Sequence, residues 1–157
     1  MDLKLYIERA ENELKLAQII YRISDKAEIQ INVFDVKSPE TYYSSVISHC
    51  YYSIFYSAKA YLLKKNVKIG PPEEHKKTYE EFKKFVESGD LDVELLKIYQ
   101  QALTRADVLL GIFSREKSKR GKFTYRTLPQ ANKEPANESI SNAKIFFKNI
   151  NLLCSDF

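Results

Sequence analysis

The chain has 157 residues, a net charge of +4 and a sequence pI near 8.9, which suit a single basic globular domain over residues 1–157. The hydrophobic fraction of 44% and the charged fraction of 29% are those of an ordinary folded protein and argue against a disordered chain. No apolar run approaches the roughly 20 residues of a membrane span, and the first residues lack a signal peptide's pattern, so we expect a cytoplasmic protein without a membrane segment.

The first predicted helix covers residues 3–23, because apolar residues recur there at spacings of three and four. Asp2 precedes this pattern and is the expected N-cap. Arg9, Glu11 and Glu13 are expected on the solvated face. Residues 24–37 lack a clear period and are expected to form a connecting segment that packs onto the helices.

The second predicted helix starts at Ser38–Pro39 and runs to about Asn66, since serine caps helices and proline suits the first helical position. It is aromatic on several sides, which predicts a central helix or a subunit interface. Its aromatic residues are Tyr42, Tyr43, Tyr51, Tyr52, Phe55, Tyr56 and Tyr61. The sequence Gly70–Pro72 then interrupts the chain.

Three further helices are expected over residues 74–88, from Asp90 or Asp92 to near Gly121, and from Pro135 to Cys154. A loop is expected over residues 121–134. The buried face of the fourth helix is predicted to contain Leu96, Tyr99, Leu103, Ala106, Leu110 and Phe113. That of the last helix is predicted to contain Ala136, Ile140, Ala143, Phe147, Ile150 and Cys154. Five amphipathic helices with short connections predict an all-α antiparallel bundle.

The cysteines, Cys50 and Cys154, form no CxxC spacing, and the histidines are His49 and His75. We therefore expect no metal site, and no motif indicates a cofactor. Both cysteines stand among apolar residues, which predicts buried free thiols and a reducing cytoplasmic setting.

The stretch Ser48–Leu63 has a Tyr-Tyr pair, an aromatic residue three positions on, then small residues and a Leu pair. This pattern resembles the HEPN family, which is often encoded beside minimal nucleotidyltransferases. His75 with Phe82 resembles the family's histidine at the start of the third helix, and Arg105-Ala106-Asp107 its Arg-x-Asp on the fourth. The resemblance covers about residues 40–153, including the closing helix. It implies a helical bundle, a homodimer with clefts at the dimer junction, and a nucleotidyltransferase-type antitoxin partner.

The chain departs from the ribonucleases of that family, which carry a histidine four to six residues after the arginine. Here the residues that follow Arg105 are Ala-Asp-Val-Leu-Leu-Gly-Ile, without a histidine. Cleavage of RNA needs a base for the 2′-hydroxyl and an acid for the leaving group, and an arginine stays protonated. The ribonuclease motif is therefore incomplete.

Four residues are the candidates for acid-base work or phosphate binding: Arg105, Asp107, His49 and His75. Two residues apart on a helix, Arg105 and Asp107 point in different directions, so Arg105 needs a partner from another helix. His49, Glu74 or a tyrosine hydroxyl could supply it. The simpler interpretation makes Arg105 a structural hydrogen-bonded arginine, His49 an interior or interface residue, and His75 a capping or surface residue.

A basic segment, residues 115–126, follows the predicted buried face of the fourth helix. It contains six cations and one acid, which give a local charge of +5. Aromatic rings are interleaved with the cations, a pattern typical of single-stranded nucleic-acid binding. The candidate nucleic-acid-binding residues are Arg115, Lys117, Lys119, Arg120, Lys122, Phe123, Tyr125 and Arg126. The alternative is a solvated helix end whose lysines suit the helix dipole.

Three functions remain open from sequence. The first is a HEPN-family nucleic-acid-associated module that binds RNA or a nucleotide, or is toxin-like, with an incomplete ribonuclease motif. The second is a ribonuclease using His49 or His75 with Arg105. The third is a noncatalytic interaction module or dimeric scaffold built on the aromatic helix.

Overall fold

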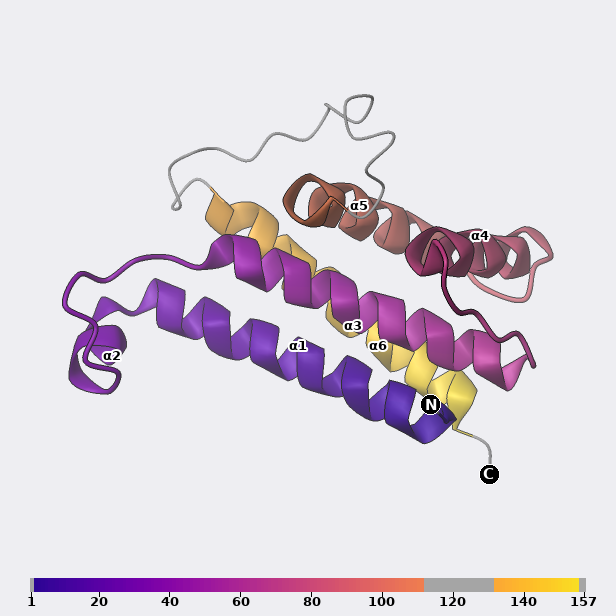
Figure 1. Ribbon diagram of the computed structural model, residues 1–157, viewed down its shortest axis with the longest axis horizontal. Helices are drawn as coiled ribbons and strands as arrows, with labels where there is room; N and C mark the ends of the chain where they lie inside the picture. Colours follow the sequence, from indigo (N-terminus) through magenta and orange to yellow (C-terminus); the bar gives the residue numbers. More distant parts are fainter. Residues whose placement is uncertain (1, 112–131, 156–157) are drawn as a thin grey trace.

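The computed structural model describes residues 2–111 and 132–155, which contain six α-helices and no strand (Figure 1). The predicted all-α class is confirmed. No helix in the described part of the chain is long and apolar enough to cross a membrane. The helices are α1 (Leu3–Asp25), α2 (Ala27–Asn32), α3 (Tyr43–Lys64), α4 (Glu74–Glu87), α5 (Val93–Leu110) and α6 (Lys133–Cys154).

Helix α3 is the central element, and it packs against α1, α4, α5 and α6. Figure 1 shows α1 running antiparallel to α3 and α6, with α4 and α5 on the other side of α3. Residues around most of the α3 circumference are buried, including Tyr43, Tyr51 and Phe55. The aromatic residues of α3 therefore serve mainly as core, since each aromatic ring buries a large apolar area. The predicted central position of this helix is confirmed.

The starts of two helices were predicted correctly from their capping residues, Asp2 and Asp92. The backbone N–H of Leu5 donates to Asp2 Oδ1 at 2.9 Å, and the N–H of Glu94 donates to Asp92 Oδ1 at 2.9 Å. Each carboxylate satisfies an N–H that has no partner within the helix. Asp2 is the predicted cap of the first helix, and Asp92 was one of the two predicted starts of the fourth.

The expected connecting segment and the expected start at Ser38 are both wrong in part. Residues 27–32 form the short helix α2, and α3 begins at Tyr43. The buried side-chain amide of Gln30 joins the end of α1 to the segment before α3. Its Nε2 donates to the carbonyls of Ile23 and Glu40, and its Oε1 accepts from the Glu40 N–H. Ser24 Oγ accepts from the Tyr42 N–H at 2.8 Å. These side chains, rather than helical bonds, satisfy the backbone before α3.

The fourth predicted helix ends earlier than expected, at Leu110 rather than near Gly121. Gly111 adopts a left-handed conformation with φ of 62°, and its N–H donates to the Asp107 carbonyl at 2.9 Å. Glycine reaches this conformation without the penalty of a Cβ atom, so it ends the helix. Leu110 is 39% exposed rather than buried. Phe113 and residues 121–131 of the expected loop lie outside the described residues, whereas residues 133 and 134 of that loop belong to α6 instead.

Helix α6 begins at Lys133, two residues before the predicted start. Pro135 lies in its first turn, where its missing N–H costs no helical hydrogen bond. Phe146 is fully buried, whereas the predicted Phe147 is only partly buried. Cys50 is a buried free thiol as predicted, but Cys154 is only half-buried because it lies at the end of α6.

Candidate functional site

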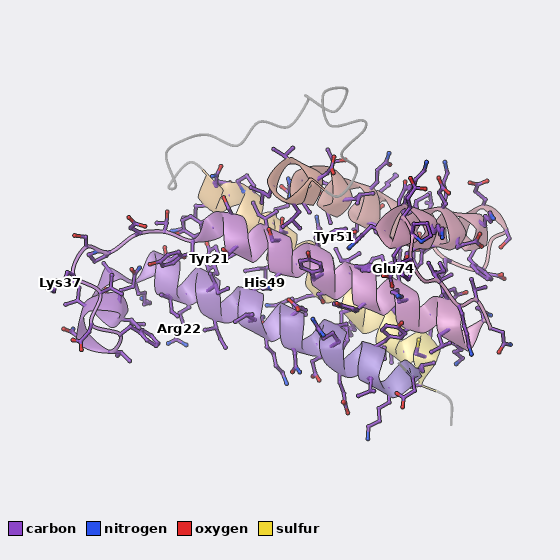
Figure 2. All side chains as sticks on the ribbon, in the orientation of Figure 1. Tyr21, Arg22, Lys37, His49, Tyr51 and Glu74 are labelled. Carbon is purple, nitrogen blue, oxygen red and sulfur yellow. The ribbon has the colours of Figure 1, made fainter. Side chains whose placement is uncertain are left out.

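The predicted site residues occupy separate regions of the bundle. His49 lies on α3, on the side that faces α1, and Figure 2 shows it beside α1. His75 lies at the start of α4, whereas Arg105 and Asp107 lie on α5. Among the contacts of the described residues, none joins Arg105 to either histidine. The structure therefore does not assemble the four residues into one cleft by direct contact.

His49 forms a close pair with a carboxylate of α1. Its Nδ1 lies 2.6 Å from Glu13 Oε2, and Arg9 Nε lies 3.6 Å from Glu13 Oε1. Arg9 and Glu13 are one helical turn apart, so both reach the same side of α1. The Glu13 side chain is only 14% exposed, which corrects its expected place on the solvated face. A carboxylate on one ring nitrogen orients the imidazole and leaves the other nitrogen for a ligand or a proton.

Tyrosine rings extend this pair along α3. Tyr52 and Tyr56 follow His49 by three and seven residues, so the three share one side of the helix. The Tyr56 ring stacks on Tyr52 at 6.4 Å between centroids, and the Arg9 guanidinium lies 4.8 Å from the Tyr56 centroid. Tyr6 of α1 stacks on Tyr56 at 6.3 Å. We call this surface the α1–α3 face, defined by Tyr6, Arg9, Glu13, His49, Tyr52 and Tyr56.

His75 packs into the aromatic core beside the α1–α3 face. Its ring lies 4.2 Å from the Phe55 centroid, and its Nδ1 lies 2.7 Å from the Tyr51 hydroxyl oxygen. Burial raises the pKa of Tyr51 well above its ordinary value, so the hydroxyl keeps its proton and can donate a hydrogen bond to His75. Burial, aided by the positive charge of Lys59, lowers the pKa of His75. His75 is therefore neutral near pH 7.

Arg105 is held by α6. Its guanidinium is almost buried and donates to Ser139 Oγ at 3.3 Å, to the Pro135 carbonyl at 3.4 Å and to Glu138 Oε1 at 3.2 Å. The prediction of a partner from another helix is confirmed, but these partners are not the His49, Glu74 or tyrosine hydroxyl that we considered. Asp107 is 1% exposed, and its charge adds to the raised pKa of Tyr51.

The basic segment, residues 115–126, lies outside the described residues, so its eight candidate nucleic-acid-binding residues stay predictions. The described ranges contain no group of three or more His, Cys, Asp or Glu side chains that could hold a metal ion.

Three residues were not among the predicted site residues, although each contacts one of them or lies at an unusual buried position: Arg9, Glu13 and Lys59. Lys59 offered a signal, because it is a lone cation in the apolar run from Ser57 to Leu63. Buried lysines are rare unless they are paired. Arg9 and Glu13 offered none, since an arginine and a glutamate four residues apart are common on solvated helices.

The lowered pKa of His75 predicts that the protein loses stability as pH falls. The unfolded chain protonates His75 near its ordinary pKa of about 6.5, while the folded chain resists protonation until lower pH. The unfolded state then binds more protons, so the free energy of unfolding decreases below about pH 6.5. We expect Tm to fall between pH 7.5 and 5.5, and to fall less in His75→Gln. Calorimetry measures both; an equal fall in the two proteins would contradict the assignment.

Comparison with known proteins gives one family and one relative. The model of the HEPN domain family matches residues 20–153. "Putative toxin MJ0142" of Methanocaldococcus jannaschii is 31% identical to this chain over 91 residues, which cover 57% of this chain and 60% of that protein. The matched stretch thus spans less than two thirds of the relative's length. No solved structure matches the chain.

Proposed function

The chain belongs to the HEPN family, and we propose that it is a toxin-like, RNA-associated HEPN module that acts as a cytoplasmic homodimer and cleaves RNA slowly or not at all. The observation that carries this proposal is the family match over residues 20–153, together with the similarity to a protein named as a toxin. A nucleotidyltransferase-type antitoxin is the partner that the family resemblance implies.

The surroundings of Arg105 support weak cleavage. Arg105 donates to Ser139, Pro135 and Glu138, and these bonds to α6 fix its guanidinium. After Arg105 the helix continues only to Leu110 and contains no histidine. A guanidinium can bind a phosphate, but it stays protonated and cannot itself accept the proton of a 2′-hydroxyl. The position therefore favours a structural role, with phosphate binding as an added one.

A pull-down of the tagged full chain with its neighbouring gene products tests the proposal. We expect a nucleotidyltransferase-like protein in the eluate, and RNA rather than DNA when the bound nucleic acid is typed with specific nucleases. Recovery of the chain with protein partners and without RNA would favour the interaction-scaffold alternative instead.

The proposed dimer uses the α1–α3 face and the apolar stripe next to it. Leu5, Leu16 and Ile19 are 48%, 40% and 55% exposed. Their spacing places all three on one side of α1, beside Arg9. Exposed apolar side chains next to half-buried tyrosines are typical of a protein interface, where aromatic residues and arginine are enriched. A second copy of this chain is the occupant that we propose.

Tyr56→Glu is expected to weaken the dimer at least about tenfold, because a carboxylate would replace an aromatic ring at the centre of the α1–α3 face. Sedimentation velocity over a range of concentrations measures the dissociation constant. Val93→Glu is the matched control, since Val93 is 56% exposed on another helix, α5. A wild type that is monomeric at high micromolar concentration, or an equal effect of the two variants, would contradict this interface.

A second candidate function is RNA cleavage by His49, and the 2.6 Å contact between His49 and Glu13 favours it. Held by Glu13 at Nδ1, the imidazole could accept the 2′-hydroxyl proton at Nε2 while the 2′-oxygen attacks phosphorus, and the 5′-oxygen would leave with a proton taken from water. Arg9, beside Glu13, could neutralise the phosphate. This candidate replaces Arg105 by Arg9 as the cation that works with a histidine.

Substitutions separate the two candidates. If His49 is the base, His49→Asn should lower the cleavage rate roughly 100-fold or more, and Glu13→Gln should lower it less. Arg105→Ala should leave the rate nearly unchanged. The rate is measured on a fluorescent single-stranded RNA without added metal. Cleavage at rates typical of enzymes that survives His49→Asn would exclude this site, and rapid cleavage that Arg105→Ala abolishes would refute the incomplete-motif proposal.

A further inference from the structure

A cavity of about 230 Å³ lies between the start of α1, the second half of α3 and the connection to α4. Apolar and aromatic side chains of Tyr6, Leu62, Leu63, Val67 and Ile69 line it, although polar atoms contribute the larger share of its exposed surface. Lys59 and Lys68 are the two cations that line it. Tyr6 also belongs to the α1–α3 face, and the charge of Lys59 acts on His75, but none of the described hydrogen bonds of His49, His75 or Arg105 involves a residue that lines this cavity. Concave sites that combine apolar side chains with a few charged groups are candidates for small-molecule binding.

Lys59 is the unusual member of this cavity, because its side chain is only 7% exposed. Its ammonium forms an ion pair with Glu74 and lies 5.0 Å from the Tyr6 ring centroid and 5.6 Å from that of Phe55. Burial lowers the pKa of Lys59. An ammonium has three donors, and Glu74 accepts from it while the two rings offer only their faces. The described contacts thus leave donor capacity at the cavity wall for an anionic group.

Size and charge define the ligand class. The volume lies below the roughly 300–1,000 Å³ of drug-sized pockets, so the cavity suits roughly ten to fifteen non-hydrogen atoms. Two lysines against Glu74 give a formal charge of +1. That charge matches a monoanion, whereas a phosphate dianion would bring excess negative charge beside Glu74. We propose that this cavity binds a small organic monocarboxylate, with the carboxylate at Lys59 and an apolar body against Leu62, Leu63 and Val67.

The site is tested on the full chain with 2-naphthoate as the probe, by isothermal titration calorimetry. We expect measurable binding below millimolar concentration. The neutral analogue 2-naphthalenemethanol has a similar body without the charge and should bind at least tenfold more weakly. Equal affinity for the two probes, or no binding of 2-naphthoate at 5 mM, would overturn the proposal. Tighter binding of 2-naphthyl phosphate than of 2-naphthoate would overturn the assignment to a monocarboxylate.

Variants locate the binding. Lys59→Met keeps an unbranched side chain but removes the charge, and it should lower the affinity for 2-naphthoate at least tenfold. Glu74→Gln raises the formal charge of the site to +2 and should strengthen the binding of 2-naphthoate severalfold. Because the two variants have opposite expected effects, misfolding alone cannot explain both results. Lys76→Gln, on an exposed residue outside the lining, should have no effect. Unchanged affinity in Lys59→Met with a native circular dichroism spectrum would place the probe elsewhere.

Discussion

Reversal of charge at Lys119, Arg120 and Lys122 together is expected to weaken the binding of single-stranded RNA roughly 100-fold at low salt. Each of these side chains is proposed to neutralise one phosphate and release the counterion held there. The loss of three contacts should flatten the slope of log affinity against log salt by roughly two to three units. Affinity of the wild type should itself fall steeply with added salt, because counterion release drives the contact.

The charge reversal needs a control with the same change in net charge. Lys76, Lys83 and Lys84 are exposed on α4, and their joint reversal should change RNA affinity far less. Arg105→Ala should leave most of the salt dependence intact, since it removes at most one phosphate contact. Fluorescence anisotropy with labelled RNA at four salt concentrations measures both quantities. If the two triple variants lose affinity equally, the effect is one of overall charge, and the scaffold function becomes the better interpretation.

Alkylation is expected to distinguish the two thiols by roughly 1,000-fold or more in rate. Burial raises the pKa of Cys50 to about 12, and its side chain is 0% exposed, so at pH 8 almost none of it is the reactive thiolate. Cys154 is only half-buried at the end of α6, so we expect a reagent to reach it more easily than Cys50. Iodoacetamide should therefore label Cys154 quickly and Cys50 only when the protein unfolds.

Intact mass spectrometry of the labelled chain measures this difference, with peptide mapping to assign the site. In guanidinium chloride both thiols should react at similar rates, which controls for their intrinsic chemistry. Rapid labelling of Cys50 in the native protein would mean that the core around α3 opens far more often than its complete burial indicates.

The starts of two helices show which features could be predicted from the local sequence alone. Asp2 and Asp92 could be identified as caps because a capping bond joins residues two or three apart, and the sequence shows that spacing directly. The same holds for the three-four spacing of the apolar residues, which follows from 3.6 residues per turn. Local periodicity was therefore enough for the all-α class and for the existence and order of the five long helices, but not for all of their ends.

Tertiary contacts decided what the local pattern could not. The start of α3 depends on Gln30, which binds Glu40 ten residues away, and a serine-proline signal at Ser38 does not reveal that bond. The end of α5 is local by contrast: Gly111 adopts a positive φ and its N–H bonds to the Asp107 carbonyl four residues back, a glycine stop that the sequence prediction overlooked.

The candidate sites depend on the tertiary structure most of all. The pairing of His49 with Glu13 joins residues 36 apart, and the bonds from Arg105 to α6 join residues about 30 apart. Such pairs require a particular rotation and register of two helices, which packing of the whole core sets. The sequence by itself determined a helical bundle of the HEPN type with a basic segment and no histidine after Arg105. Only the tertiary structure decided that α6 holds Arg105, that Glu13 orients His49, and that Lys59 lines a cavity, because each of these contacts joins side chains of different elements.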